Sequence, residues 1–128
     1  MTKIKSHILI VEDEMVIGMT IRNKLQSMGY GVSGLVDSWE DAAYILEKSQ
    51  TDLVLLDIRI KGSIDGIELG RQIIEVMKIP VIFLTAHSDN ITIQRAAQIQ
   101  HSGYIVKPFR DEELKTTIEK ALSKVHGT

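Results

Sequence analysis

Five polar residues follow short apolar runs in this 128-residue sequence, and their types suit phosphoryl chemistry. They are Glu12, Asp13, Asp57, Thr85 and Lys107. Clustered carboxylates repel and raise one another's pKa unless a cation lies among them, and a hard divalent ion such as Mg²⁺, or Mn²⁺, would resolve that conflict. A lysine beside such an ion suits an anion that the metal holds. These groups together can position a phosphoryl group, and a carboxylate can itself accept one as an aspartyl phosphate.

The apolar runs before these residues have the length of β-strands. They span residues 8–11, 32–36, 53–56, 81–84 and 104–106. The run before Asp57 is continuously aliphatic, which indicates a strand that is buried on both faces, as in a parallel sheet covered by helices. Asp57 would then end that strand at the sheet edge where open α/β folds bind their ligands.

Amphipathic segments separate the predicted strands. The first has apolar residues at positions 17, 21, 25 and 28 and should stop at Gly29. Ser38 and Asp65 are predicted to cap the second helix, which should end near Ser49, and the third, which should continue through Met77. The last two helices are expected from about 89 to 99 and over 111–125.

This alternation predicts an α/β fold: a single doubly wound, five-stranded parallel sheet of the flavodoxin-like (βα)5 type. We assume the strand order 2-1-3-4-5, although other orders satisfy the same pattern. That order would place Glu12 and Asp13 beside Asp57, with Thr85 and Lys107 on the two following strand ends.

Length and composition favour one domain over residues 1–128, with a core of about 5–125, since 44% of the residues are hydrophobic. The absence of cysteine excludes disulfides and thiolate chemistry. A net charge of −2 with dispersed Lys and Arg argues against a nucleic-acid site in this chain. No apolar run reaches the length of a signal peptide or membrane span, so we expect no membrane partner and a cytoplasmic protein.

Several short motifs together resemble the receiver domain of two-component response regulators, the chemotaxis-regulator-like family. They are Glu12-Asp13, Asp57, Thr85-Ala86, Tyr104 and Lys107-Pro108-Phe109. Each motif is short, but all follow the predicted strands in the right order over essentially the whole chain. The resemblance implies a signalling domain that catalyses its own phosphorylation and dephosphorylation without being an enzyme in the usual sense.

The resemblance implies a phosphoacceptor site built on Asp57. Asp57 would take a phosphoryl group from the phosphohistidine of a histidine kinase or phosphotransfer domain. Asp13 and Asp57 would bind Mg²⁺, Glu12 would assist through water, and the backbone carbonyl of Arg59 would supply a further oxygen. Lys107 would contact the phosphoryl oxygens.

The resemblance also implies a conformational switch. Thr85 would move to hydrogen-bond the phosphorylated side chain, and Tyr104 would move with it from outward to inward. A cis peptide bond before Pro108 would orient Lys107. Homodimerisation through the fourth and fifth helices is a habit of the family.

One loop departs from the family pattern. Receivers commonly have proline at the position of Lys61, and here the Asp65-Gly66 pair comes one residue later than usual. The loop on the metal side is therefore expected to be longer. Arg59 and His87 occupy positions that tune the lifetime of the phosphoryl group in the family, and we expect Arg59 to modify attack by water.

Other interpretations of the same residues stay open. Thr85 could be an ordinary strand-end hydroxyl and Tyr104 a half-buried core aromatic. The acidic run Glu12, Asp13 and Glu14 could instead be the first turn of a helix, where the macrodipole favours negative charge. A phosphatase or phosphotransferase with an Asp nucleophile would want a second carboxylate where Arg59 stands. A flavodoxin-like flavin or nucleotide module would want a Gly/Ser/Thr loop in place of residues 12–14, and a degenerate receiver would accept no phosphate.

Overall fold

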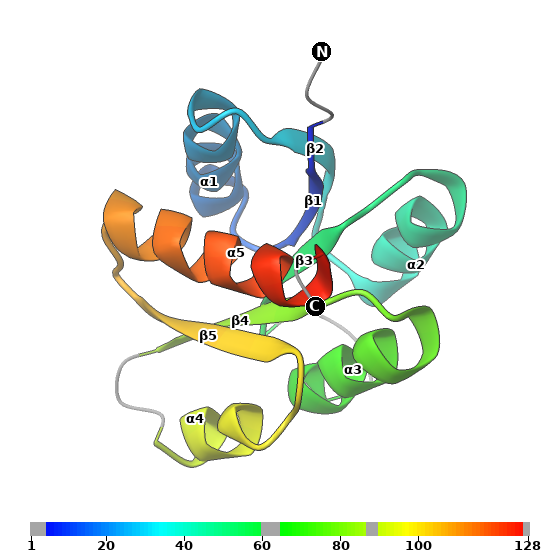
Figure 1. Cartoon of the computed structure of the whole chain (residues 1–128), viewed down its shortest axis with the longest axis vertical. Helices are drawn as coiled ribbons and strands as arrows, with labels where there is room; N and C mark the ends of the chain where they lie inside the picture. The colour runs from blue at the N-terminus through cyan, green and yellow to red at the C-terminus, as the bar shows by residue number, and fades with distance from the viewer. Residues whose placement is uncertain (1–4, 60–64, 87–89, 127–128) are drawn as a thin grey trace.

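The computed structural model describes residues 5–59, 65–86 and 90–126, and its centre is a single parallel sheet (Figure 1). The strands are β1 (His7–Val11), β2 (Gly31–Val36), β3 (Leu53–Asp57), β4 (Val81–Ala86) and β5 (Ser102–Lys107). They lie in the order β2-β1-β3-β4-β5, which confirms the predicted topology. Every residue of β3 is buried, as its aliphatic sequence predicts for a strand covered on both faces.

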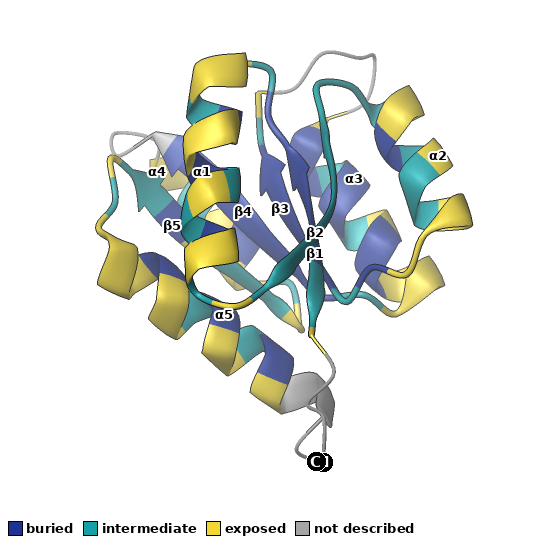
Figure 2. Cartoon of the chain, turned by 90° about the horizontal axis from the view of Figure 1, so that it is seen from above, coloured by how far each residue is buried: buried dark blue, intermediate teal, exposed yellow. Residues whose placement is uncertain are grey.

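Helices cover both faces of the sheet (Figure 2). They are α1 (Met15–Ser27), α2 (Trp39–Lys48), α3 (Gly66–Gln72), α4 (Asn90–Ala97) and α5 (Asp111–His126). α1 and α5 pack on one face around Ile10, Leu55 and Leu84. Side chains of α2, α3 and α4 pack on the other face around Leu9 and Leu56. Alternate residues of each central strand therefore point into two separate hydrophobic clusters.

The predicted helix boundaries are confirmed where a cap defines them. Gly29 ends the turn after α1 with φ at 95°, a left-handed conformation that suits glycine. The N–H of Asp41 donates to Ser38 Oγ at 3.3 Å, which caps α2. The N–H of Ile67 donates to Asp65 Oδ1 at 2.7 Å, which caps α3.

We predicted a third helix that continues to Met77, but the α-helix ends at Gln72. The next five residues form a π-helical segment, η1 (Ile73–Met77), which ends at Lys78 in a left-handed conformation with φ at 60°. The wider turn of a π-helix rotates side chains away from an α-helical stripe. Met77 is accordingly 40% exposed, although the pattern places it on the apolar face.

Other boundaries also differ from the predicted ranges, among them those of β5 and α4. β5 begins at Ser102, two residues before the apolar run that starts at Tyr104, because pairing with β4 extends to Ser102 and Gly103. α4 is shorter than residues 89–99 and ends at Ala97. No helix in the described ranges is both long and apolar enough to cross a membrane.

Candidate metal centre

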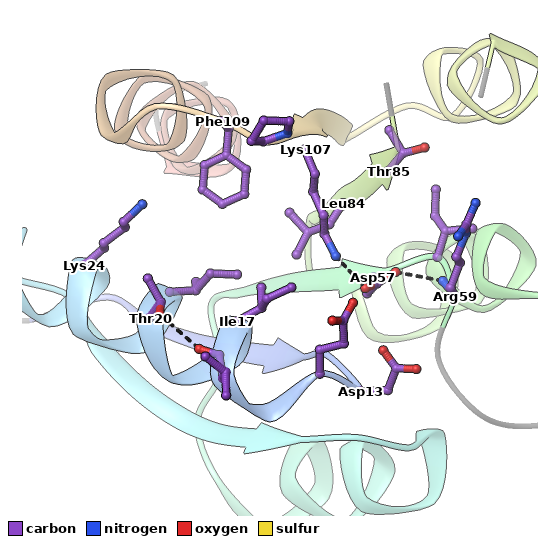
Figure 3. A pocket seen from close by; sticks show the side chains of 15 residues that line it. Asp13, Ile17, Thr20, Lys24, Asp57, Arg59, Leu84, Thr85, Lys107 and Phe109 are labelled. Atoms are coloured by element: carbon purple, nitrogen blue, oxygen red, sulfur yellow. Dashed lines mark hydrogen bonds and ion pairs between the residues drawn. The ribbon is translucent and has the colours of Figure 1, made fainter. Parts of the chain in front are cut away.

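Four strands bring the predicted site residues together at the carboxyl edge of the sheet. Asp57 is the last residue of β3, and Glu12 directly follows β1, its neighbour in the sheet. Thr85 and Lys107 lie in the final two residues of β4 and β5. Because all strands are parallel, these residues converge from distant parts of the sequence. Figure 3 shows Asp13, Asp57, Thr85 and Lys107 around one hollow.

The three acidic residues form a candidate metal site. Glu12, Asp13 and Asp57 offer carboxylate oxygens that all lie within 4.8 Å of one another. Glu12 is fully buried, Asp57 is 5% exposed, and Asp13 is half-buried. Glu12 Oε2 is buried and has no hydrogen-bond partner among the described residues. An all-oxygen donor set with a buried orphan oxygen fits a hard divalent cation, because such a cation removes both the repulsion and the unmet polar group.

Lys107 connects two of these carboxylates. Its Nζ donates to Asp57 Oδ2 at 2.8 Å and to Glu12 Oε1 at 2.9 Å. The other Asp57 oxygen, Oδ1, accepts the backbone N–H of Arg59 at 2.8 Å. Both oxygens of Asp57 are therefore held in place before any ligand binds.

The electrostatic environment separates the two buried carboxyls. Burial, together with the neighbouring Asp57 carboxylate, raises the pKa of Glu12 from 4.5 to about 7. Burial also acts to raise the pKa of Asp57, but hydrogen bonds with Glu12, Lys107 and the Arg59 N–H outweigh it and lower that pKa. Burial acts to lower the pKa of Lys107, and its two carboxylate partners raise it overall. The ionised form is therefore favoured at Asp57, and Glu12 is the carboxyl that keeps its proton to higher pH.

The remaining predicted residues lie at different distances from this centre. Thr85 is buried and borders the hollow beside Asp57, and Arg59 is exposed at its rim. The Lys107–Pro108 peptide bond is cis. Tyr104 is 42% exposed on β5, opposite Phe83 in the register of β4 and β5. The predictions for Lys61 and His87 fall outside the described residues.

The hollow continues as a groove of about 750 Å³ between α1 and the connection from β5 to α5. Ile17, Ile21 and Leu84 contribute apolar lining, and Lys24 and Phe109 lie toward its far end (Figure 3). Lys24 Nζ lies 5.4 Å from the centroid of the Phe109 ring. An extended apolar groove of this size can contact more than a phosphoryl group.

This groove and its rim were not predicted from the sequence. Val16 lines the groove and is 78% exposed on α1. It falls outside the apolar stripe that marks the buried face of the helix. An exposed apolar residue on the polar face of a helix next to the candidate site is the sequence signal that could have identified the rim.

The sequence model of the response regulator receiver domain matches residues 8–119. The chain belongs to the response regulator receiver family. Receiver domains are signalling modules of two-component systems rather than conventional enzymes, and they partner with histidine kinases and typically use Mg²⁺. The acidic pocket of this receiver fits that family chemistry.

The curated relatives that this receiver matches are longer than the chain itself. The transcriptional regulatory protein PdtaR of Mycobacterium tuberculosis is 32% identical over 117 residues, which are 91% of this chain and 57% of the relative. The aerobic respiration control protein ArcA of Escherichia coli is 33% identical over 118 residues, which are 92% of this chain and 49% of the relative. The receiver thus spans about half the length of the curated relatives it matches.

Solved structures share the fold. The signal receiver domain of a modulated diguanylate cyclase from Desulfovibrio desulfuricans is 33% identical with a TM-score of 0.83, and the match covers 95% of this chain and 97% of that one. A CheY-like receiver from Methanospirillum hungatei has a TM-score of 0.83 at 22% identity, over 97% of this chain and 98% of that one. The second match supports the fold alone.

Proposed function

We propose that this receiver accepts a phosphoryl group on Asp57 from a phosphohistidine, and so acts as a switch in a phosphorelay. The position of Asp57 carries the proposal. It is nearly buried at a strand end, paired with Lys107 at 2.8 Å and grouped with two further carboxylates. Its lowered pKa keeps it ionised, as a nucleophile must be.

In the proposed reaction, an Asp57 oxygen attacks the phosphorus, and the bond between phosphorus and the imidazole nitrogen of the donor breaks. The Arg59 N–H and the Lys107 ammonium hold the two Asp57 oxygens and restrict how the carboxylate can turn. Lys107 Nζ donates to both Glu12 and Asp57, so it can contact the phosphoryl oxygens by giving up one of these two hydrogen bonds. Such preorganised charge is the main protein contribution to phosphoryl transfer.

We infer that Mg²⁺, or Mn²⁺, is the cofactor of this reaction. Asp13 and Asp57 would bind it directly, Glu12 would assist through water, and the backbone carbonyl of Arg59 would complete the protein ligands. The bound cation would supply positive charge against the phosphoryl oxygens. The buried, unpartnered Glu12 Oε2 supports this assignment.

A protein donor is favoured over a small molecule by the groove beside Asp57. A small phosphodonor needs the polar end alone, whereas the apolar lining along α1 and Phe109 offers contact area to a larger partner. A histidine kinase or a phosphotransfer domain is the partner we propose, and the exposed Val16 on the rim supports contact with an apolar surface.

The output of the switch is proposed to be a change in the surface formed by α4, β5 and α5. Thr85 would hydrogen-bond the phosphorylated Asp57, and Tyr104 would move inward in response. Thr85 borders the hollow and Tyr104 is partly exposed on the neighbouring strand, which is compatible with such a movement. A homodimer through α4 and α5 would use the same surface.

The lifetime of the aspartyl phosphate is proposed to depend on Arg59 and His87. Arg59 is exposed at the rim, where its side chain can reach over Asp57 and modify the approach of water. Replacing Arg59 and His87 singly by alanine should change the rate at which the phosphate adduct disappears. Unchanged lifetimes in both variants would contradict this assignment.

Mass measurement after incubation with acetyl phosphate and Mg²⁺ tests the central proposal. The native protein should gain one phosphate adduct, and Asp57→Asn should gain none. Asp52→Asn is the matched control, because the carbonyl oxygen of the new amide side chain can still accept the His7 N–H that Asp52 Oδ2 accepts at 2.8 Å. An adduct that persists in Asp57→Asn, or that never forms on the native protein, would refute the assignment.

A further inference from the structure

α4 buries little of its surface. Among its described side chains Ala96 is buried, and Ile91 at its start is 74% exposed. A helix that buries so few apolar atoms gains little from packing, so polar contacts have a larger share in fixing its position.

The carboxyl end of α4 is tied to β5. Ser102 Oγ lies 2.9 Å from the carbonyl oxygen of Ala96 and 2.6 Å from that of Ile99, and its proton is shared between these two acceptors. Carbonyls at the end of a helix lack intrahelical partners, so this hydroxyl both satisfies and anchors them. These hydrogen bonds hold the carboxyl end of α4 on β5.

A second polar contact ties α4 to the start of α3. Arg95 Nη1 donates to Asp65 Oδ2 at 2.9 Å, while Asp65 Oδ1 accepts the N–H of Ile67 that caps α3. Hydrogen bonds from Arg95 and Ile67 outweigh the effect of burial and lower the pKa of Asp65. The Asp65 carboxylate thus caps α3 and also binds a side chain of α4.

The Asp65 end of this contact is fixed close to the phosphoacceptor. Gly66 packs so tightly on Ile58, the residue after Asp57, that an added Cβ would lie 2.5 Å from the Ile58 carbonyl oxygen. The first turn of α3 therefore packs directly on the backbone of Ile58. The Asp65 end of the Arg95–Asp65 pair is therefore held by the cap of α3 and by the backbone that follows Asp57.

We propose that the Arg95–Asp65 ion pair is a strap that favours the position of α4 in this structure and restrains the response of the α4, β5 and α5 surface to phosphorylation. The regulatory part of this inference rests on the proposed function of Asp57. Both partners are about half exposed, at 48% and 47%, so the strap is weak enough to open.

Hydrogen exchange of the α4 amides tests the strap directly. Arg95→Gln removes one partner, and Asp65→Asn removes the charge of the other while keeping a good N-cap for α3. In each variant the amide hydrogens of residues 90–97 should exchange about two- to fivefold faster than in the native protein, as expected for the loss of one exposed ion pair. The double variant should be no faster than either single one, and added salt should speed exchange in the native protein alone.

Arg110→Gln is the matched control. Arg110 is 86% exposed and pairs with Glu113 at 3.6 Å within the first turn of α5, so this change removes the same charge without touching the strap. Unchanged α4 exchange in both strap variants, or an equal increase in Arg110→Gln, would overturn the strap.

The rate of phosphorylation by acetyl phosphate tests the regulatory part. Both strap variants should gain the phosphate adduct about two- to fivefold faster than the native protein, since the strap no longer opposes the change. Faster α4 exchange with an unchanged phosphorylation rate would overturn the regulatory role. If the native protein gains no adduct, the proposed function fails and the regulatory role with it, while the exchange result still decides whether the strap holds α4.

Discussion

Replacing Glu12 by Gln should remove a pH-dependent loss of stability from the metal-free protein. The pKa of the buried Glu12 carboxyl is about 7, against an ordinary 4.5, a difference of about 2.5 pH units. At about 1.4 kcal/mol per unit, the ionised form destabilises the folded state by about 3 kcal/mol. Between pH 4.5 and 7 the unfolded chain has released this proton and the folded protein retains it, so a rise in pH through this window favours unfolding.

The other groups of the site act outside that window. The lowered pKa of Asp57 contributes stability that is present above its ordinary value of 3.8 and is lost as the pH falls. The raised pKa of Lys107 contributes stability that is lost only above 10.5. The four histidines are common to native protein and variant. The difference between the two proteins therefore isolates Glu12.

Urea unfolding between pH 4 and 8.5, in the presence of a chelator, measures that difference. Relative to the native protein, Glu12→Gln should gain about 3 kcal/mol in free energy of unfolding across this range. Glu14→Gln removes the same charge at an exposed neighbouring position and is the matched control. A difference for Glu12→Gln that does not vary with pH would refute the reasoning, because Glu12 would then ionise in the folded protein as it does in the unfolded chain.

Two further substitutions test packing and charge. In Gly70→Ala the new methyl group would overlap the fully buried ring of Phe83, so urea unfolding should show a loss of about 1–3 kcal/mol, whereas Gly103→Ala, whose nearest neighbour is at 3.5 Å, should be near neutral. Equal effects of the two changes would contradict the close packing of α3 on the sheet. Lys107→Met should slow phosphorylation by acetyl phosphate about 100-fold, while Lys115→Met on exposed α5 should not, and a native rate without Lys107 would exclude its role.

The centre of the sheet could be predicted from the sequence because β1 and β3 are buried on both faces. Residues 53–56 form a continuous aliphatic run with a polar residue after it, and that end is where β3 stops. The start of β5 could not be predicted, since Ser102 and Gly103 have no strand preference and are drawn into the sheet by pairing with β4. The π-helical segment Ile73–Met77 could not be predicted either, because the same apolar spacing fits an α-helix.

The site could be predicted as a set of residues but not as a set of contacts. Parallel topology alone brings Glu12, Asp13, Asp57 and Lys107 to one edge of the sheet. Which carboxylate the ammonium would meet depends on side-chain reach and burial, and the structure shows that it meets both Glu12 and Asp57. The raised pKa of Glu12 follows from full burial, which an acidic run after a strand does not reveal.

The excess of carboxylates at this edge connects stability with function. Three carboxyl groups lie there near the single ammonium of Lys107, which pairs with two of them. The site therefore has an excess of acidic groups, and a phosphoryl group on Asp57 would add further negative charge. A divalent cation would offset that charge in the proposed reaction, and at neutral pH it would compete with the proton on Glu12. Glu12→Gln should therefore be more stable than the native protein above pH 7 without metal, yet slower to gain the phosphate adduct when Mg²⁺ is limiting. Saturating Mg²⁺ should restore most of the rate, because Asp13 and Asp57 remain; a slow rate that Mg²⁺ does not restore would instead indicate that Glu12 acts on Lys107 rather than on the cation.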